Sequence, residues 1–507
     1  MNLSTLLKVH ANKQPNHEAL VSPNERVSYQ EWDERVNRLA NGLRNLGFQE
    51  GDKLIIHLPN VPEFLYLYMA AVRLKGLAIP INAKLTQQEI QYIIDHSEAN
   101  FFATHELLFE ASKGLTEEND LTFIKTGEAE GVWHSVNQLL REEVTVIECD
   151  ATEDDEVSIL YTSGTTGNPK GVVFTHRSIL TVSTMISIEM TMNEHSRVLH
   201  MMPLSHSAPL HLFMGAALYT GATHVLAPTF TPDLLLQMVS NEKVTHFFGA
   251  PVAYLLSAKQ PNIDEFDLSS MKYWVYGGAP LGQNEVKFVK EKFKTDSLWC
   301  VYGLTEAGPS GTLLKAEEHA EKAGSIGRRA ALNTEIRLVD EQGQDVAQGE
   351  PGEIVLRGEG NMKGYYKAPE KTAETLKDGW LYTGDIAVQD EDGYYWVIDR
   401  KKDVIISGGV NIYPTEVEQA LVQHPSIEDV AIVGVPHAEW GETAKAFVVL
   451  NEPVSDLASS CKAFLEGRVA DYKIPKLYAE VEALPRNATG KLLRNQLRDS
   501  AEEMTSK

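Results

Sequence analysis

The chain has 507 residues, of which 43% are hydrophobic and 23% are charged, an ordinary composition for a globular protein. Its 46 basic and 71 acidic residues give a formal net charge of −25, which argues against non-specific binding to nucleic acid. A polyanionic ligand would therefore need a local basic site. The length suggests about three domain-sized units, or a large domain with a smaller one.

The cysteines and the N-terminus bear on the cellular compartment. Cys149, Cys300 and Cys461 form a sparse, odd set without metal-ligand spacing, which predicts a reducing, cytoplasmic compartment and no disulfide framework. We expect all three to be buried apolar residues. Residues 1–8 lack the apolar core of a signal peptide, and no run of 18 apolar residues predicts a transmembrane helix.

The first hundred residues alternate between helical and strand patterns. Residues 28–43 carry apolar side chains at helical spacing, and Ser28 and Glu31 are placed as a capping box. The next segments read as strand, helix and strand: residues 53–58, 63–74 and 77–81. This order predicts a largely parallel sheet covered by helices.

The same rhythm returns between about residues 176 and 300, with strands at 222–226 and 244–248 and a helix at 231–241. After about residue 325 the sequence pattern changes to short predicted strands separated by glycines: residues 335–339, 353–357 and 393–398. This pattern predicts an antiparallel β subdomain. Residues 412–507 read as a compact α+β unit, so the predicted fold class is α/β with a smaller C-terminal domain.

Residues 161–171 read YTSGTTGNPKG, and apolar, β-branched segments on both sides predict flanking strands. Gly164 and Gly167 let the backbone turn tightly and direct several N–H groups at one point, and Lys170 adds a positive charge. Hydroxyl donors come from Ser163, Thr165 and Thr166. Composition alone favours a plain hairpin loop, and the order is not that of the Walker motif.

The order does resemble the signature loop of the acyl-adenylate-forming superfamily, which includes acyl-CoA synthetases, aryl-CoA ligases, luciferases and peptide-synthetase adenylation domains. All eleven positions of residues 161–171 fit that pattern, and further motifs follow in the family's order over about residues 10–500. The resemblance implies ATP binding by the loop residues Thr162, Ser163, Gly164, Thr165, Thr166, Gly167 and Lys170.

Residues 302–306, YGLTE, follow an apolar run, so they lie at a strand end, where open α/β sheets bind ligands. A carboxylate there can hold Mg²⁺, although a Thr–Glu pair alone would be read as a helix cap. The resemblance makes Glu306 the Mg²⁺ ligand, brings Thr305 near the α-phosphate and the acyl carboxylate, and assigns Tyr302 and Gly303 to the nucleotide site.

Residues 276–281 read YGGAPL, and two glycines after a strand permit the close approach of a flat ligand. The plain alternative is a strand-to-helix turn. The resemblance implies that Gly278, Ala279 and Pro280 line the adenine and the acyl carboxylate.

Residues 382–385, YTGD, end in an aspartate that would usually be a turn residue. In the resembling family this aspartate, here Asp385, binds the ribose hydroxyls, a task suited to an ionised acceptor. Arg400 shares that role.

The charged cluster at 399–403 could be a solvated linker, but the resemblance makes it a hinge with Lys402 at its centre. We therefore expect an N-terminal domain at 1–399, a hinge at 400–402 and a mobile C-terminal domain at 403–507. Gly408 and Gly409 are expected to line a tunnel for the pantetheine arm of CoA; the alternative is a plain strand–turn–helix connection.

Residues 485–491, PRNATGK, open a basic stretch in an acidic chain, which on its own indicates a basic helix face. The resemblance implies that Lys491 reaches the acyl carboxylate and the α-phosphate, and acylation of Lys491 would then switch the enzyme off.

The resemblance also assigns acyl-binding roles to His206, Phe248 and Gly277, although His206 taken alone would be structural. The candidate walls are mainly apolar: residues 205–212, 247–254, 277–278 and Val301. They show no clear arginine for a second carboxylate, which weakens a dicarboxylic substrate, and His206 and His211 are their polar exceptions.

Together these motifs indicate an ATP-dependent acid–thiol ligase that uses Mg²⁺ and CoA and forms an acyl-adenylate. The first-choice acid is a medium- or long-chain fatty acid, followed by an aryl acid such as coumarate or benzoate. An acyl-AMP ligase that loads a carrier protein and a non-catalytic binding protein are the alternatives. A homodimer is expected from the family alone, and no nucleic-acid partner is expected.

Overall fold

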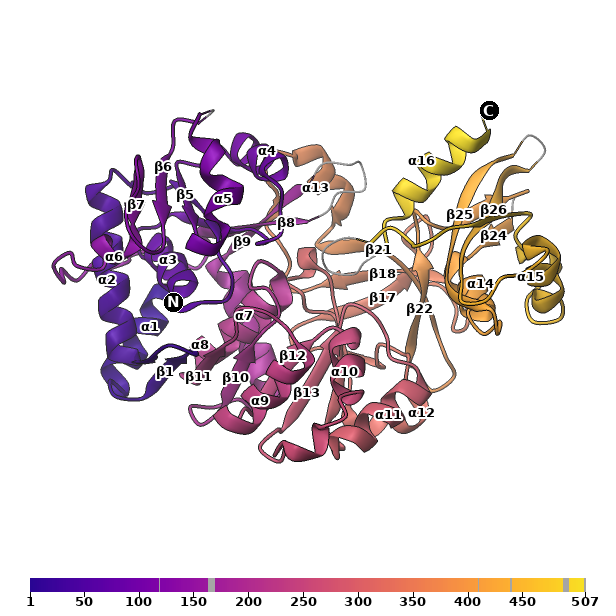
Figure 1. Ribbon diagram of the computed structural model, residues 1–507, viewed down its shortest axis with the longest axis horizontal. Helices are drawn as coiled ribbons and strands as arrows, with labels where there is room; N and C mark the ends of the chain where they lie inside the picture. Colours follow the sequence, from indigo (N-terminus) through magenta and orange to yellow (C-terminus); the bar gives the residue numbers. More distant parts are fainter. Residues whose placement is uncertain (118, 163–168, 409, 438–439, 487–491, 506–507) are drawn as a thin grey trace. The chain divides into compact units, whose positions relative to one another are not determined.

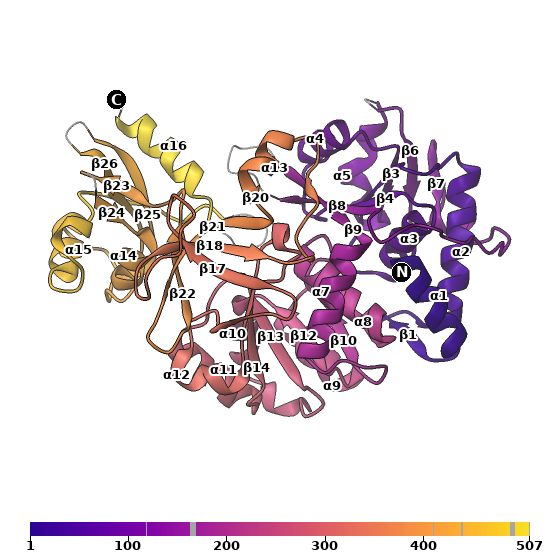
Figure 2. The ribbon, with the colours of Figure 1, turned by 180° about the vertical axis from the view of Figure 1, so that it is seen from behind.

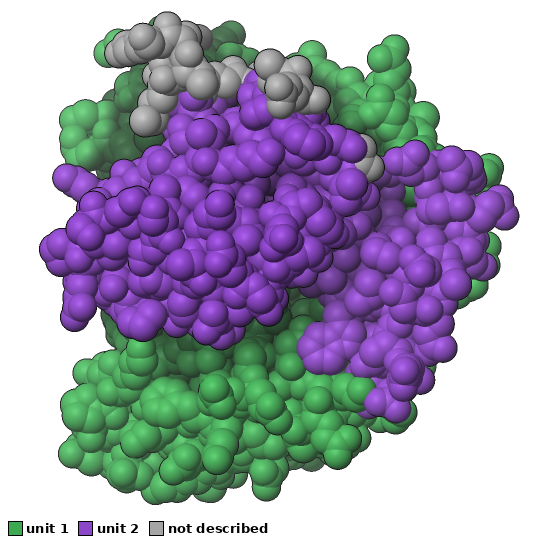
Figure 3. Space-filling model, turned by 90° about the vertical axis from the view of Figure 1, so that its right-hand side faces the viewer, with its two compact units in different colours: residues 1–336, 355–382 green, residues 337–354, 383–507 purple. Residues whose placement is uncertain are grey.

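The structure is a computed structural model that describes every residue except 118, 163–168, 409, 438–439, 487–491 and 506–507 (Figure 1). The described residues form two compact units, residues 1–336 with 355–382 and residues 337–354 with 383–507 (Figure 3). The predicted hinge at 400–402, and the domain boundaries drawn from it, stay a prediction.

One sheet of the first unit contains the two strands that flank the glycine-rich loop. Its strands are β3 (Lys53–His57), β4 (Leu77–Pro80), β5 (Phe101–Thr104), β6 (Thr122–Lys125), β7 (Trp133–Ser135), β8 (Glu156–Thr162), β9 (Lys170–Thr175) and β19 (Gly364–Tyr365). They run in the order β19-β9-β8-β4-β3-β5-β6-β7. The neighbouring strands in the series β8-β4-β3-β5-β6-β7 pair in parallel. The pairs β8 with β9 and β9 with β19 are antiparallel. The largely parallel sheet is confirmed.

The other sheet of this unit contains the motif strands near residues 276 and 302. Its strands are β1 (Glu18–Val21), β2 (Arg26–Ser28), β10 (Arg197–His200), β11 (Thr223–Leu226), β12 (His246–Gly249), β13 (Tyr273–Gly277), β14 (Leu298–Tyr302), β15 (Thr312–Leu314) and β16 (Arg329–Ala330). They run in the order β16-β15-β14-β13-β12-β10-β11-β1-β2. Strands β10 to β14 pair in parallel.

Helices cover both faces of this sheet, because successive strand residues point to opposite sides. On β13, Val275 joins a core that includes Phe213 and Val182. These residues come from α7 (His176–Glu189) and the π-helix η3 (Ala208–Met214), which is followed by α8 (Gly215–Thr220) (Figure 2). On the other face Trp274 packs on Tyr254 of α10 (Pro251–Ala258) and on Phe293 of α11 (Gln283–Phe293).

The helix starts read from the sequence are also confirmed. Helix α2 (Tyr29–Asn45) has Ser28 as its N-cap: the Glu31 N–H donates to Ser28 Oγ at 3.2 Å, and the Ser28 N–H donates to Glu31 Oε2 at 2.7 Å. This reciprocal pair satisfies two backbone donors at the helix end. Helices α3 (Pro62–Arg73) and α9 (Pro232–Glu242) each begin at a proline, whose missing N–H costs nothing there.

A third sheet contains β17 (Glu335–Val339), β18 (Gly352–Arg357), β20 (Leu376–Lys377), β21 (Trp380–Gln389) and β22 (Tyr395–Arg400). The order is β17-β18-β21-β20, and β22 pairs antiparallel with β21. The three short strands predicted between residues 335 and 398 are therefore present, within two residues of their expected ends.

The last part of the chain is the expected α+β unit. Its strands are β23 (Ile405–Ser407), β24 (Val410–Ile412), β25 (Ile427–His437), β26 (Gly441–Leu450) and β27 (Leu477–Glu480), in the order β24-β23-β26-β25 with β27 paired to β26. Helices α14 (Pro414–Leu421), α15 (Leu457–Leu465) and α16 (Arg494–Thr505) accompany them. Val417, Ile432 and Val448 share one buried core, which joins α14 to the sheet. Among the described residues, no helix is long and apolar enough to cross a membrane.

Candidate active site

The loop motif emerges between two paired strands, as the sequence predicted. Thr162 ends β8 and pairs in register with Lys170, the first residue of β9. Residues 163–168, which include Ser163, Gly164, Thr165, Thr166 and Gly167, lie outside the described residues. Burial lowers the Lys170 pKa from its ordinary value, and the neighbouring charge of Lys371 lowers it further. The hairpin thus presents a half-buried cation directly after the loop.

The second motif begins at the carboxyl end of β14, where Tyr302 is the last strand residue. The backbone of Gly303, the next residue, passes so close to the Pro309 carbonyl that a Cβ at this position would collide with it. Thr305 and Glu306 open the short 3₁₀ helix η5 (Thr305–Ala307). Their location at a strand end agrees with the sequence prediction and with the usual place of ligand sites in such sheets.

Side chains from other segments hold this motif. The hydroxyl of Ser207 lies 3.1 Å from that of Thr305, and Tyr365 Oη donates to Glu306 Oε1 at 2.9 Å. Burial raises the Tyr365 pKa, and the Glu306 charge raises it further, so this hydroxyl keeps its proton and acts as the donor. Tyr365 lies far from this motif in the sequence, and only the pairing of β19 with β9 brings it here.

The third motif begins with the last two residues of β13, Tyr276 and Gly277, and borders an apolar wall. Gly277 is buried, and a Cβ there would lie 2.7 Å from the Val301 carbonyl oxygen and 3.1 Å from Phe248 Cε2. Phe248 in turn stacks on Phe213 at 5.2 Å between ring centroids. Gly278 has a φ of 84°, a conformation that favours glycine. The next two residues, Ala279 and Pro280, are exposed.

His206, the polar candidate for the acyl site, lies just before the π-helix η3. Its Nε2 atom lies 3.3 Å from the Asn82 amide nitrogen, and burial lowers its pKa. The ring is therefore neutral at neutral pH. Asn82 was not predicted from sequence, because it is 124 residues away along the chain.

The second unit brings Asp385 and Arg400 together. They are register partners in β21 and β22, and Arg400 Nε lies 2.6 Å from Asp385 Oδ1. The aspartate side chain is only 5% exposed and the arginine 40%, so the pair is anchored in the sheet and open at one side. The Asp385 N–H also donates to Thr383 Oγ1 at 3.1 Å.

Further along the same unit, the Lys402 carbonyl accepts a hydrogen bond from Arg498 at 3.5 Å, and Arg498 pairs with Asp403. Gly408 has a φ of 59°, and its N–H donates to the Trp440 carbonyl at 2.8 Å. A Cβ at Gly408 would press on the exposed Trp440 ring, so a side chain there would displace that ring. Gly409 and Lys491 lie outside the described residues.

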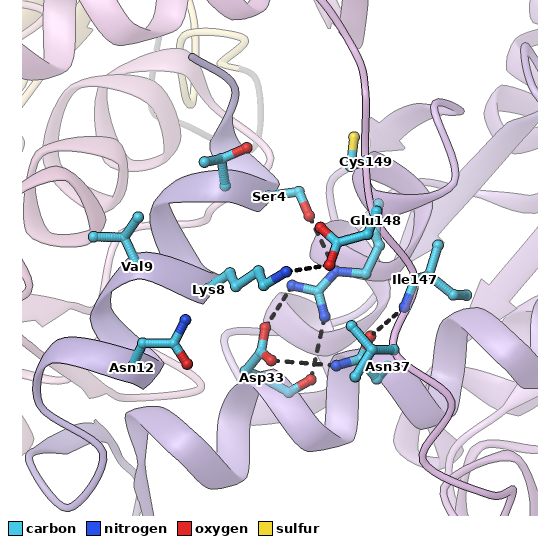
Figure 4. A pocket seen from close by; sticks show the side chains of 12 residues that line it. Ser4, Lys8, Val9, Asn12, Asp33, Asn37, Ile147, Glu148 and Cys149 are labelled. Carbon is cyan, nitrogen blue, oxygen red and sulfur yellow. Dashed lines mark hydrogen bonds and ion pairs between the residues drawn. The ribbon is translucent and has the colours of Figure 1, made fainter.

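A different pocket, of about 280 Å³, lies among α1 (Leu3–Lys13), α2, α3 and residues 146–149 (Figure 4). Arg73 is buried there, with its guanidinium 2.6 Å from Asp33 Oδ1 and its Nε donating to Ser4 Oγ at 3.0 Å. Its lining contains no residue of the predicted motifs, and its polar groups bond one another. Cys149 lines this pocket and is half-buried, so the expectation of full burial is correct for Cys300 and Cys461 and wrong for Cys149.

The comparisons with known proteins agree with these motifs. The model of the AMP-binding enzyme family matches residues 7–366, and that of the AMP-binding enzyme C-terminal domain matches residues 416–491. The chain therefore belongs to the AMP-binding enzyme family, within the acyl-adenylate-forming superfamily.

Its relatives cover nearly the whole chain. A feruloyl-CoA synthase of Amycolatopsis sp is 36% identical over 93% of this chain and 93% of its own length. A long-chain-fatty-acid–CoA ligase of Bacillus subtilis (strain 168) is 33% identical over 99% of this chain and 95% of its own. The Bacillus subtilis o-succinylbenzoate CoA synthetase in complex with its acyl-adenylate intermediate is 30% identical, covers 97% of this chain and 98% of that one, and has a TM-score of 0.86.

Proposed function

We propose that this chain is an ATP-dependent acid–thiol ligase, which joins a carboxylic acid to CoA through an acyl-adenylate and releases AMP and pyrophosphate. The observation that carries the proposal is the position of Glu306, whose carboxylate is held by Tyr365 at the end of β14. Tyr365 belongs to the strand that pairs with β9, and β9 begins with Lys170. The Glu306 carboxylate and the Lys170 cation, which suit a nucleoside triphosphate with its metal ion, are thus held by neighbouring segments.

The first half-reaction needs charge neutralisation rather than a general base. A carboxylic acid with an ordinary pKa of about 4.3 is already ionised at neutral pH, so its oxygen can attack the α-phosphorus directly. The difficulty is to bring two anions together and to let pyrophosphate leave. Lys170, the loop N–H groups and Lys491 are the groups that would supply a preorganised positive field.

The residues present fit Mg²⁺, which prefers oxygen ligands and usually takes one or two carboxylates together with substrate phosphates. One Glu306 oxygen accepts the Tyr365 hydroxyl, and the carboxylate has a second oxygen for a cation. In the described part of the chain, no group of three histidine, cysteine or acidic side chains would hold a metal without the nucleotide. Bound Mg²⁺ would neutralise phosphate charge, while Glu306 and Thr305 orient the phosphates.

In the second half-reaction the CoA thiol attacks the acyl carbonyl and AMP leaves. We propose that Asp385 and Arg400 hold the ribose, and that the buried Asp385 carboxylate accepts hydrogen bonds from the ribose hydroxyls. Rotation at Lys402 would withdraw Lys491 after adenylation and bring residues 408–409 to the pantetheine arm. The left-handed conformation of Gly408, which glycine adopts without strain, keeps this part of the backbone free of a side chain.

The acid has an apolar body, because Phe248 and Val301 form the wall next to Gly277. A medium- or long-chain fatty acid is the first candidate. An aryl acid is a second candidate with its own support: the partly buried Phe248 ring, stacked on the buried Phe213 ring of the core, offers a flat aromatic face. The relatives include ligases named for both classes, so the acid has to be measured.

The test is pyrophosphate release over a panel of fatty acids from six to eighteen carbons, cinnamic and benzoic acids, and malonate. Each acid is assayed with CoA, with a phosphopantetheine carrier protein and without an acceptor. Turnover that requires CoA and favours one acid class supports the proposal and names the substrate. Adenylate formation without thioester points to a carrier-protein loader, and no pyrophosphate exchange with any acid would refute the ligase.

A further inference from the structure

Tyr365 contacts both Glu306 of the 302–306 motif and Lys170 of the 161–171 motif. Its hydroxyl donates to Glu306 Oε1 at 2.9 Å across 59 residues of sequence. Its backbone lies in β19, where Tyr365 is the register partner of Val172 and Gly364 of Val173. The side chain is half-buried, so the contact is partly shielded from water.

The backbone on both sides of this hydrogen bond is held as well. The Met362 N–H donates to the Glu306 carbonyl at 2.8 Å. Gly308 has a φ of 82°, and a Cβ there would collide with the Gly360 carbonyl, so the two segments approach closely. The position of the Glu306 main chain and the direction of its side chain are thus set by the same segment, residues 360–365.

The Tyr365 ring faces the cation of the loop motif. Lys170 Nζ lies 5.5 Å from the ring centroid, within the range of a cation–π interaction. The Tyr365 N–H donates to Thr372 Oγ1 at 2.9 Å, and that hydroxyl donates to the Ala368 carbonyl at 2.9 Å. The ring is therefore held from the backbone side, with its hydroxyl on the carboxylate and its face toward the lysine.

We propose that Tyr365 is a positioning residue, whose hydroxyl holds the Glu306 carboxylate in the orientation that receives the Mg²⁺ of the bound nucleotide. The proposal rests on the proposed function, because it assigns that role to Glu306. Carboxylates that bind metals are themselves hydrogen-bonded, and loss of such a partner typically weakens metal affinity about 10–100-fold. A glutamate without this hydrogen bond would have to lose its side-chain freedom when the cation binds.

The test replaces Tyr365 by phenylalanine, which keeps the ring and its face toward Lys170 and removes only the hydroxyl. Binding of a non-hydrolysable ATP analogue is measured by calorimetry at a series of Mg²⁺ concentrations and in EDTA. For Y365F we expect about 10–100-fold weaker binding in Mg²⁺ and wild-type binding in EDTA. The matched control is Y366F, because the Tyr366 hydroxyl donates to the Ser97 carbonyl at 3.3 Å and not to Glu306.

A double-mutant cycle separates positioning from a general loss of structure. If Tyr365 acts through Glu306, adding Y365F to E306Q should weaken Mg²⁺-dependent binding by less than about twofold, because contacting residues are non-additive. Should Y365F fail to fold, Thr372→Val loosens the same strand from the backbone side and should reduce Mg²⁺-dependent binding several-fold.

The outcomes distinguish this inference from the function on which it rests. Wild-type protein that binds no nucleotide in Mg²⁺ would overturn both. Wild-type protein that binds the analogue, with Y365F equal to Y366F, overturns the positioning role alone. An equal loss in Mg²⁺ and in EDTA also overturns it, because the hydroxyl would then act on the nucleotide pocket as a whole and not on the cation.

Discussion

The substitution Gly277→Ala tests whether the apolar wall around Gly277 borders the acyl group, as proposed. The new methyl group would lie 2.7 Å from the Val301 carbonyl oxygen and 3.1 Å from the Phe248 ring. Val301 is the register partner of Gly277 on the adjacent strand, so the carbonyl cannot rotate away without moving β14. We expect the overpacking to cost about 1–3 kcal/mol of unfolding free energy.

The same methyl group would narrow the proposed acyl site. One methylene in an apolar pocket changes selectivity by about 10–200-fold. We therefore expect the kcat/KM for a bulky acid, relative to that for a two- or three-carbon acid, to fall by at least about tenfold. The ratio is the useful readout, because a general loss of folded enzyme lowers both values equally.

The assay is pyrophosphate release with both acids, together with thermal unfolding. Gly76→Ala is the matched control: its Cβ would lie 2.8 Å from the Asp52 carbonyl and would also press on the Phe48 ring, at a position outside the proposed site. It should lose comparable stability and keep the wild-type acid ratio. The same acid ratio in both variants would show that Gly277 does not border the acyl group.

Three further changes test other parts of the proposal. Asp385→Asn should raise the ATP KM about 10–100-fold, since hydrogen bonds to a charged group are worth about 1.5–3 kcal/mol; an unchanged ATP KM would count against ribose binding. Lys491→Ala should abolish adenylation but largely spare thioester formation from supplied acyl-AMP, and half-reaction kinetics that show equal losses would disprove this division. Burial lowers the His200 pKa to about 3 and the His224 pKa well below its ordinary value, so both are neutral when folded. In the unfolded chain both histidines bind a proton below about pH 6.5. The free energy of unfolding should therefore fall below that pH by up to about 1.4 kcal/mol per pH unit for each histidine. A melting temperature that is constant between pH 7 and 5 would contradict this.

The local signals in the sequence predicted the elements well, for reasons that stay within a few residues. The capping box at Ser28 and Glu31 involves residues three apart, and a β-strand shows its pattern in five or six side chains. The strands on both sides of residues 163–168 and the strand end at Tyr302 follow from the same reasoning. The family itself was recognisable because its motifs are short and keep their order.

The family, the order of the elements and the positions of the motif residues could thus be read from the sequence. The tertiary structure decided which other side chains meet them: Tyr365 reaches Glu306 across 59 residues, and Ser207 reaches Thr305 across 98. It also decided that Gly277 must be glycine, because the Val301 carbonyl and the Phe248 ring come from neighbouring strands. Such contacts depend on strand order and register, which arise only when distant segments pair, so no local pattern carries them.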